Sequence, residues 1–189
     1  MLGLPHRQTL TSIEAGTRLL SAEELVRATE AFRVPLDYFT DRFAVHGEAQ
    51  FSWRRYNDVS QDAITAFEER VGRLFGAYRI LSESLGAEYR RRVQPLEMDR
   101  ETTPEEALRV GEKWSKQLAR DDHNESWLVD GVEDAFGIPV LCLDAPKSLS
   151  GAVCHLTDMD GVVVNRLDPP GRRNFDLAHE LFHALTWSK

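Results

Sequence analysis

Two histidines and a glutamate near the C-terminal end of the chain have residue types and a spacing that could bind a metal ion and activate a water molecule. The run His179-Glu180-Leu181-Phe182-His183 is an H-E-x-x-H pentad. On a helix, residues four apart lie one turn above each other, so both imidazoles can reach one Zn²⁺ at about 2.0 to 2.1 Å. The carboxylate of Glu180 lies about 100° further round the helix, within reach of a metal-activated water. We therefore predict His179 and His183 as metal ligands and Glu180 as the general base of a metal-assisted peptide hydrolysis.

The helix that carries the pentad is predicted to be amphipathic. A helical wheel places Phe175, Ala178 and Phe182 with the leucines on an apolar arc, and Arg172, Asp176 and the polar pentad residues on the opposite arc. We therefore expect the metal site on the polar side, off the core, with Arg172 as a pocket cation and Asp176 as a group that orients an imidazole. The alternative is an ordinary solvated helix face with two incidental histidines.

Two further histidines and the two cysteines are weighed as candidates for a metal or redox role. His155 on a predicted strand and His123 in a polar loop could replace a missing ligand, but both are more typical of surface or edge histidines. Cys142 and Cys154 lie in apolar runs, and we predict both as core residues of a protein from a reducing compartment.

Composition limits the class of protein. Hydrophobic residues make up 42% and charged residues 29% of 189, which is typical of a packed globular chain. Because no apolar run is long enough to span a bilayer and the N-terminus lacks the basic-then-apolar order of a signal peptide, we expect a cytoplasmic protein without a membrane partner. The net charge of −8 gives no broad positive field, so any contact with DNA must be local.

The first two thirds of the chain are predicted to be helical. Ser21 and Glu24 form a capping box that opens a helix over 22–32, and Val34-Pro35 ends it. Apolar residues every three or four positions predict one long amphipathic helix from about 60 to 93. Thr103-Pro104-Glu105-Glu106 opens a further helix that runs to about 118.

The last third changes character. A helix over 126–136 is followed by three short β-prone runs at 138–143, 151–156 and 161–165, and a final helix begins after Pro169-Pro170-Gly171. The predicted fold class is therefore α+β and α-rich, with three short strands plus the helix that carries the pentad.

A longer segment around the pentad resembles the active-site region of the ImmA/IrrE metallopeptidases. In that family a strand that bears an asparagine precedes an R-x-x-F-x-x-A-H-E-x-x-H helix, and here Asn165 ends the last predicted strand while Arg172, Phe175 and Ala178 fall on the matching positions. The resemblance covers 126–189 and implies a zincin-like fold, a bound Zn²⁺ and hydrolysis of a protein partner, often a transcriptional repressor.

The same resemblance predicts a third zinc ligand that this sequence does not contain. In the family this ligand is a glutamate on a helix downstream of the pentad, and no residue after His183 can match it. We therefore expect the chain to be truncated at its C-terminal end, and two histidines alone to bind zinc weakly, which would limit its activity.

The N-terminal segment 2–16 resembles the recognition helix of XRE-type helix-turn-helix repressors. Arg7, Gln8 and Thr9 are residue types that contact bases or phosphates at a helix N-terminus. The first two helices of that domain would precede Met1, so we expect truncation at this end as well; the alternative is a small helical remnant that packs on the long helix. The aromatic and cationic cluster 51–56 fits nucleic-acid stacking less well than a linker strand packed against the helical region.

These patterns predict three parts: a partial XRE-type helix-turn-helix over 1–45, a helical connector over 46–125, and the N-terminal part of an ImmA/IrrE metallopeptidase domain over 126–189. The first functional hypothesis is a zinc endopeptidase that cleaves a regulatory protein and carries a DNA-binding module. A second is a transcriptional regulator whose zincin-like domain is a sensor or interaction module. A third is a degenerate chain with neither activity.

Overall fold

The structure is a computed structural model that describes residues 7–45, 47–55, 59–86, 96, 98, 101–118 and 126–186. The chain divides into two compact units, Met1–Ala44 and Val45–Lys189, each of which is described by itself. The described helices include none with the length and apolar character needed to cross a membrane.

The first unit contains the helices α1 (Arg7–Glu14), α2 (Ala22–Phe32) and α3 (Asp37–Thr40). The predicted capping box is confirmed: the Glu24 backbone N–H donates to Ser21 Oγ at 3.2 Å, and the Ser21 N–H donates to Glu24 Oε2 at 2.9 Å. The Arg18 guanidinium also donates to Glu24 at 2.9 Å and, together with the Ser21 N–H, lowers the pKa of Glu24 to about 2. The start of α2 is therefore fixed by local contacts that the sequence encodes directly.

The second unit is built around a four-stranded sheet in the order β1-β3-β4-β2. The strands are β1 (Gln50–Arg55), β2 (Val140–Leu143), β3 (Leu149–His155) and β4 (Asp160–Asn165). β2 pairs with β4 in parallel, and the other two pairs are antiparallel. The three predicted strands are confirmed, and the fold is α+β with mostly helical elements, as predicted.

The segment predicted as a linker strand is the edge strand β1 of this sheet. Phe51 lies opposite Cys154 and Trp53 opposite Ala152 in the ladder with β3. Phe51 and Trp53 stack at 5.5 Å and pack into the core, and Trp53 Nε1 donates to Glu68 on α4 at 2.7 Å. The boundary predicted between connector and peptidase segment stays a prediction, but β1 and α4 share the sheet and core of 140–165.

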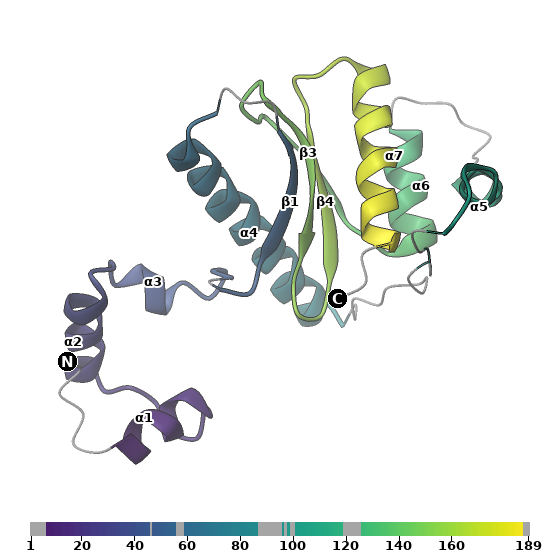
Figure 1. Cartoon of the computed structure of the whole chain (residues 1–189). Helices are drawn as coiled ribbons and strands as arrows, with labels where there is room; N and C mark the ends of the chain where they lie inside the picture. The colour runs from purple at the N-terminus through teal and green to yellow at the C-terminus, as the bar shows by residue number, and fades with distance from the viewer. Residues whose placement is uncertain are drawn as a thin grey trace. The chain divides into compact units, whose positions relative to one another are not determined.

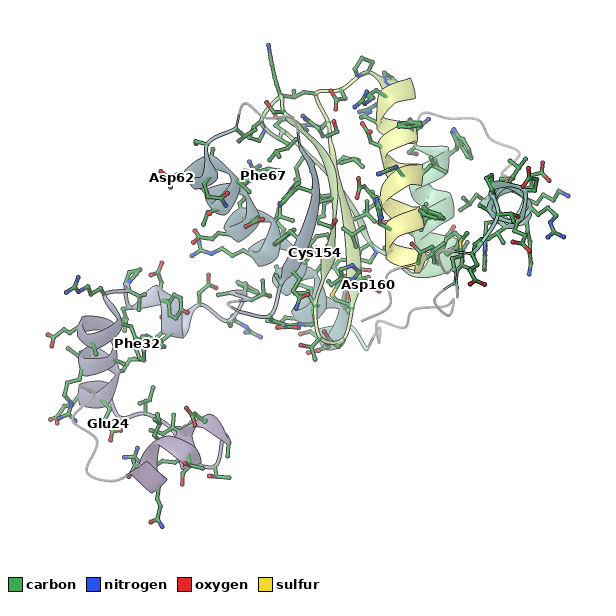
Figure 2. All side chains as sticks on the ribbon, viewed as in Figure 1. Glu24, Phe32, Asp62, Phe67, Cys154 and Asp160 are labelled. Atoms are coloured by element: carbon green, nitrogen blue, oxygen red, sulfur yellow. The ribbon has the colours of Figure 1, made fainter. Side chains whose placement is uncertain are left out.

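Helix α4 (Gln61–Ser84) covers one face of the sheet (Figure 1). Phe67, Val71 and Phe75 pack there with Ala152, Cys154 and Val163, and Figure 2 shows Phe67 and Cys154 in this layer. The predicted end of this helix near residue 93 is wrong. The helix ends at Ser84 because Leu85 leaves the helical conformation and Gly86 adopts a left-handed one with φ 71°; residues 87–95 lie outside the described part.

The opposite face is covered by α7 (Pro170–Thr186) and α6 (Trp127–Phe136), with α5 (Pro104–Leu118) packed on α6 (Figure 1). Val132 and Phe136 of α6 meet Leu177 and Leu181 of α7 in a second core, which Val153, Val162 and Val164 of the sheet complete. The predicted helices over 104–118 and 126–136 are confirmed. The sheet therefore has a helical layer on each face, and α7 brings the pentad onto β3 and β4.

The two cysteines lie in different environments. Cys154 is buried, as predicted, and burial raises the pKa of its thiol to about 12. The prediction of Cys142 as a core residue is wrong, since it is exposed on β2, an edge strand with a neighbour on one side only.

A partly buried ion pair ties three elements of the second unit together. Arg79 of α4 donates to both oxygens of Glu48, at 2.6 and 3.3 Å, and the Thr157 N–H of the β3–β4 turn donates to Glu48 Oε1 at 3.0 Å. Arg79 also lies 3.1 Å from Asp158. The Arg79 guanidinium holds the pKa of Glu48 below its ordinary value of 4.5. Glu48 therefore anchors the entry to β1 on both α4 and the hairpin.

We expect Glu48→Gln to lower the free energy of unfolding by about 1 to 2 kcal/mol at pH 7, because the charge-assisted bonds to Arg79 are lost. Since the pKa of Glu48 is depressed in the folded state, its contribution is complete above pH 4.5 and is lost as the pH falls through the folded pKa. Urea unfolding at pH 7 and pH 3 measures this, and the difference from the wild type should shrink at pH 3.

The matched control is Asp144→Asn, which removes a carboxylate from the exposed pair with Arg166 at 2.8 Å. This control should change stability much less at either pH. A Glu48→Gln effect that is no larger than that of the control would contradict the anchoring role.

Candidate active site

The pentad lies in the second half of α7, and the structure brings its two imidazoles together. His179 Nε2 and His183 Nε2 are 3.0 Å apart, with the ring centroids at 4.6 Å and the ring planes at 82°. Two nitrogens bound to one tetrahedral zinc at about 2.05 Å would be about 3.3 Å apart. Both histidines are half-buried. The two imidazoles therefore fit two ligand positions of one zinc ion with a shift of a few tenths of an ångström.

Glu180 lies on the side of α7 that faces the sheet. Only 1% of this residue is exposed. It lies against Gly151 of β3: a Cβ built on this glycine would lie 3.1 Å from Glu180 Cγ and 3.6 Å from Glu180 Oε1. The carboxylate therefore lies between helix and strand, shielded from bulk water, where electrostatic interactions are stronger than on the surface.

The orientation of α7 corrects the helical-wheel prediction. Phe175 is 56% exposed and Phe182 45% exposed, although both were expected in the core. Asp176 and Glu180, which were expected on the polar face, are buried beside Leu177, Leu181, Ala184 and Leu185. The wheel weighs hydrophobicity alone, whereas here Glu180 packs against Gly151, and Arg172, the partner of Asp176, is hydrogen-bonded to Ser150.

Asp176 is held by an arginine one turn earlier. It is fully buried, and Arg172 Nε donates to its Oδ2 at 2.7 Å. Arg172 Nη2 also donates to Ser150 Oγ at 3.3 Å, so the first turns of α7 are joined to β3. The proposed contact of Asp176 with an imidazole stays a prediction, and Arg172 is 38% exposed beside the buried carboxylate, in a position suited to a pocket cation.

Asn165 fixes the turn that leads into α7. Its Oδ1 accepts hydrogen bonds from the Ala145 and Leu167 N–H groups at 3.2 and 3.1 Å, and its Nδ2 donates to the carbonyls of Leu149 and Ala145 at 3.1 and 3.3 Å. The asparagine was noted only as part of a resemblance. Its buried amide joins the loop before β3 to the loop before α7, and both loops must be in place for the site to form.

Ser150 and Gly151 are the site residues that sequence reasoning missed. A glycine inside a β-prone run is a known sign of close approach by another backbone or side chain, and it was available at Gly151. No comparable local pattern identifies Ser150, because its partner Arg172 lies far along the chain.

The aromatic rings that α7 exposes lie next to the histidines. The Phe175 ring is stacked on His179 with the centroids 6.4 Å apart, and Phe182 meets His183 edge-on at 6.2 Å. Each imidazole therefore has an exposed aromatic ring beside it.

A third zinc ligand is not found within the described part of the chain, where no group of three His, Cys, Asp or Glu side chains could hold a metal ion. His155 does not join the pentad in such a group; its Nδ1 lies 2.6 Å from Asp160 Oδ1 at the end of the β3–β4 hairpin. His123 lies outside the described residues. The residues present therefore fit zinc as an incomplete ligand set.

The predicted DNA contacts lie in the other compact unit. Arg7, Gln8 and Thr9 form the first turn of α1, where Gln8 is exposed and Thr9 is half-buried. Nothing is described of the Arg7 side chain. The placement at a helix N-terminus agrees with the sequence expectation, and the contact itself stays a prediction.

Comparison with known proteins agrees with the geometry of the C-terminal segment. Residues 133–188 match the family model of peptidase M78, described as an IrrE N-terminal-like domain. The match takes in the end of α6, the strands β2, β3 and β4, and α7. No curated protein and no solved structure matches the chain. Residues 133–188 are thus similar to the IrrE N-terminal-like domain of the M78 metallopeptidases.

We expect Arg172→Met to lower the free energy of unfolding by about 1 to 3 kcal/mol, because a fully buried carboxylate at Asp176 loses its guanidinium partner. Urea unfolding at pH 7 measures the change. The control is Arg173→Met, which removes the same charge from the next position of α7 and should cost much less. Equal costs for both variants would show that the bond to Asp176 contributes nothing specific.

Proposed function

We propose that this chain is a zinc-dependent metalloendopeptidase of the ImmA/IrrE type that cleaves a regulatory protein such as a transcriptional repressor in the cytoplasm. The observation that supports this most directly is the convergence of His179 Nε2 and His183 Nε2 to 3.0 Å, with the buried carboxylate of Glu180 on the same helix. A solvated helix face with incidental histidines would not require a buried glutamate between them.

In this proposal His179 and His183 hold the metal. Bound Zn²⁺ supplies Lewis-acid activation of water and of the substrate carbonyl. Glu180 takes a proton from the attacking water as the new carbon–oxygen bond forms. It then gives this proton to the amide nitrogen as the carbon–nitrogen bond breaks, so that the protons balance.

The proposal requires a third protein ligand from outside the described residues. With two imidazoles alone, the affinity for zinc should be low, because catalytic zinc sites normally use three protein ligands and water. The exposed rings of Phe175 and Phe182 beside the imidazoles favour a substrate that presents an apolar side chain near the bond to be cleaved.

The main test compares the zinc content and hydrolytic activity of three proteins. We expect His179→Ala to lose zinc and hydrolysis together, whereas Glu180→Gln should keep its zinc and lose at least about a hundredfold in hydrolysis. Elemental analysis after purification in the presence of zinc, and cleavage of fluorescein-labelled casein, give the two readouts. Unchanged zinc in His179→Ala would remove the proposed site.

A second function, DNA binding by a transcriptional regulator, is favoured by one observation. Residues Met1–Ala44 form a compact unit of their own, with Arg7, Gln8 and Thr9 at the start of its first helix. In this function the zincin-like segment is a sensor or interaction module.

This function predicts salt-dependent DNA binding that Arg7→Ala and Gln8→Ala weaken, since such residues contact phosphates or bases. A gel-shift titration on DNA from the promoter of the protein's own gene, at several salt concentrations, measures it. The control is Glu14→Ala at the other end of α1, which should not weaken binding. Equal affinity of all four proteins would exclude this role for the start of α1.

A further inference from the structure

The three glycines 151, 161 and 171 lie in very different surroundings. A Cβ on Gly171, in the first turn of α7, meets no atom within 4 Å. A Cβ on Gly161 of β4 would overlap the Phe75 ring, on the face of the sheet that α4 covers. A Cβ on Gly151 of β3 would meet Glu180 Cγ at 3.1 Å and the Val163 carbonyl oxygen at 3.2 Å. Of these three positions, Gly151 is the one at which a methyl group would reach the proposed general base.

Gly151 lies on the side of β3 that faces α7. It pairs with Val164 of β4, and both Val164 and the next residue on the same side of β3, Val153, belong to the core shared with α7. Ser150, the neighbour of Gly151, accepts the hydrogen bond from Arg172 that joins β3 to the start of α7. Contacts with α7 therefore hold β3 in place on either side of Gly151: the hydrogen bond at Ser150 before it and the core packing of Val153 after it.

We propose that Gly151 is a positioning residue for Glu180. Because glycine has no side chain, the Glu180 carboxylate can lie close against β3, in the position from which it acts as general base beside the two imidazoles. This inference rests on the proposed peptidase function for its consequence, but not for its geometry. A methyl group at this position fits only if one of its two neighbours moves away by a few tenths of an ångström: the β4 backbone at Val163 or the Glu180 side chain. The side chain is the softer of the two, so Glu180 moves.

The direct test is a double-mutant cycle in the metal-free protein. We expect Gly151→Ala to lower the melting temperature clearly, and to lower it much less in a Glu180→Ala background, because truncation of Glu180 removes the conflicting atoms. Gly161→Ala should lower the melting temperature equally in both backgrounds, because its methyl group meets Phe75 on the other face of the sheet. Gly171→Ala should lower it in neither background, because its methyl group meets no atom within 4 Å. Equal losses for Gly151→Ala in both backgrounds would overturn the proposal.

The double-mutant cycle still tests the proposal if Gly151→Ala fails to fold. If Gly151→Ala alone is unfolded, a folded Gly151→Ala/Glu180→Ala protein supports the proposal. An unfolded double variant would place the conflict at the Val163 carbonyl and overturn it.

Two further readouts separate positioning from general loss of stability. With ¹³C-labelled glutamate at a fixed pH of 7.5, the Glu180 carboxyl resonance, assigned through Glu180→Gln, should shift in Gly151→Ala and stay in place in Gly161→Ala. In the zinc-loaded protein, Gly151→Ala should keep its zinc and lose about tenfold in kcat for fluorescein-labelled casein with KM unchanged. An unmoved resonance would contradict the proposal.

The failure of this proposal is distinguishable from the failure of the proposed function. If the melting temperatures show coupling between positions 151 and 180, but the wild type neither binds zinc nor hydrolyses casein, only the proposed peptidase function is refuted. Hydrolysis by the wild type without that coupling would refute only the role of Gly151.

Discussion

The site depends on the burial of two carboxylates beneath one helix. Asp176 and Glu180 lie one turn apart on the side of α7 that faces the sheet, and both are almost completely removed from solvent. Buried charge is costly unless polar groups or a cation compensate it. Arg172 compensates Asp176, and Glu180 lies against Gly151 next to the proposed metal ligands in the sequence. The rotation of α7 that buries these groups also leaves the two histidines at the border with solvent, where a metal ion and a substrate can reach them.

The rest of the second unit holds α7 in this rotation. Leu177 and Leu181 pack with α6 and the valines of the sheet, and Asn165 fixes the turn from which the helix starts. On the opposite face, α4 and the pair Glu48–Arg79 hold β1 and the β3–β4 hairpin in register. β1 thus comes from far upstream of the family match at 133–188 and yet completes the sheet on which the site is built.

Much of the fold could be predicted from sequence, because the information is local. The box of Ser21 and Glu24 acts within one helical turn, and the β-prone runs before α7 are bounded by turn residues. The end of α4 was misplaced, because apolar periodicity continues past Gly86 and outweighed a left-handed stop. The place of β1 as an edge strand depends on its pairing with residues about one hundred positions away, which no local pattern contains.

In the site, too, local features could be predicted from the sequence and long-range ones could not. The spacing of His179 and His183 predicted that their rings share one side of a helix, and the structure brings their nitrogens together. The rotation of that helix was not predictable from hydrophobicity, because Phe175 and Phe182 are exposed while two acids are buried. The rotation places Glu180 against Gly151 and Arg172 on Ser150, and these contacts become visible only in three dimensions.

The central claim is that the two imidazoles of α7 bind one zinc ion. X-ray absorption at the zinc edge of the metal-loaded protein tests this most directly. The account predicts a first shell with two nitrogen ligands at about 2.0 Å and the outer-shell scattering of imidazole carbons, which His183→Ala reduces. A shell made of oxygen ligands without imidazole scattering would contradict it.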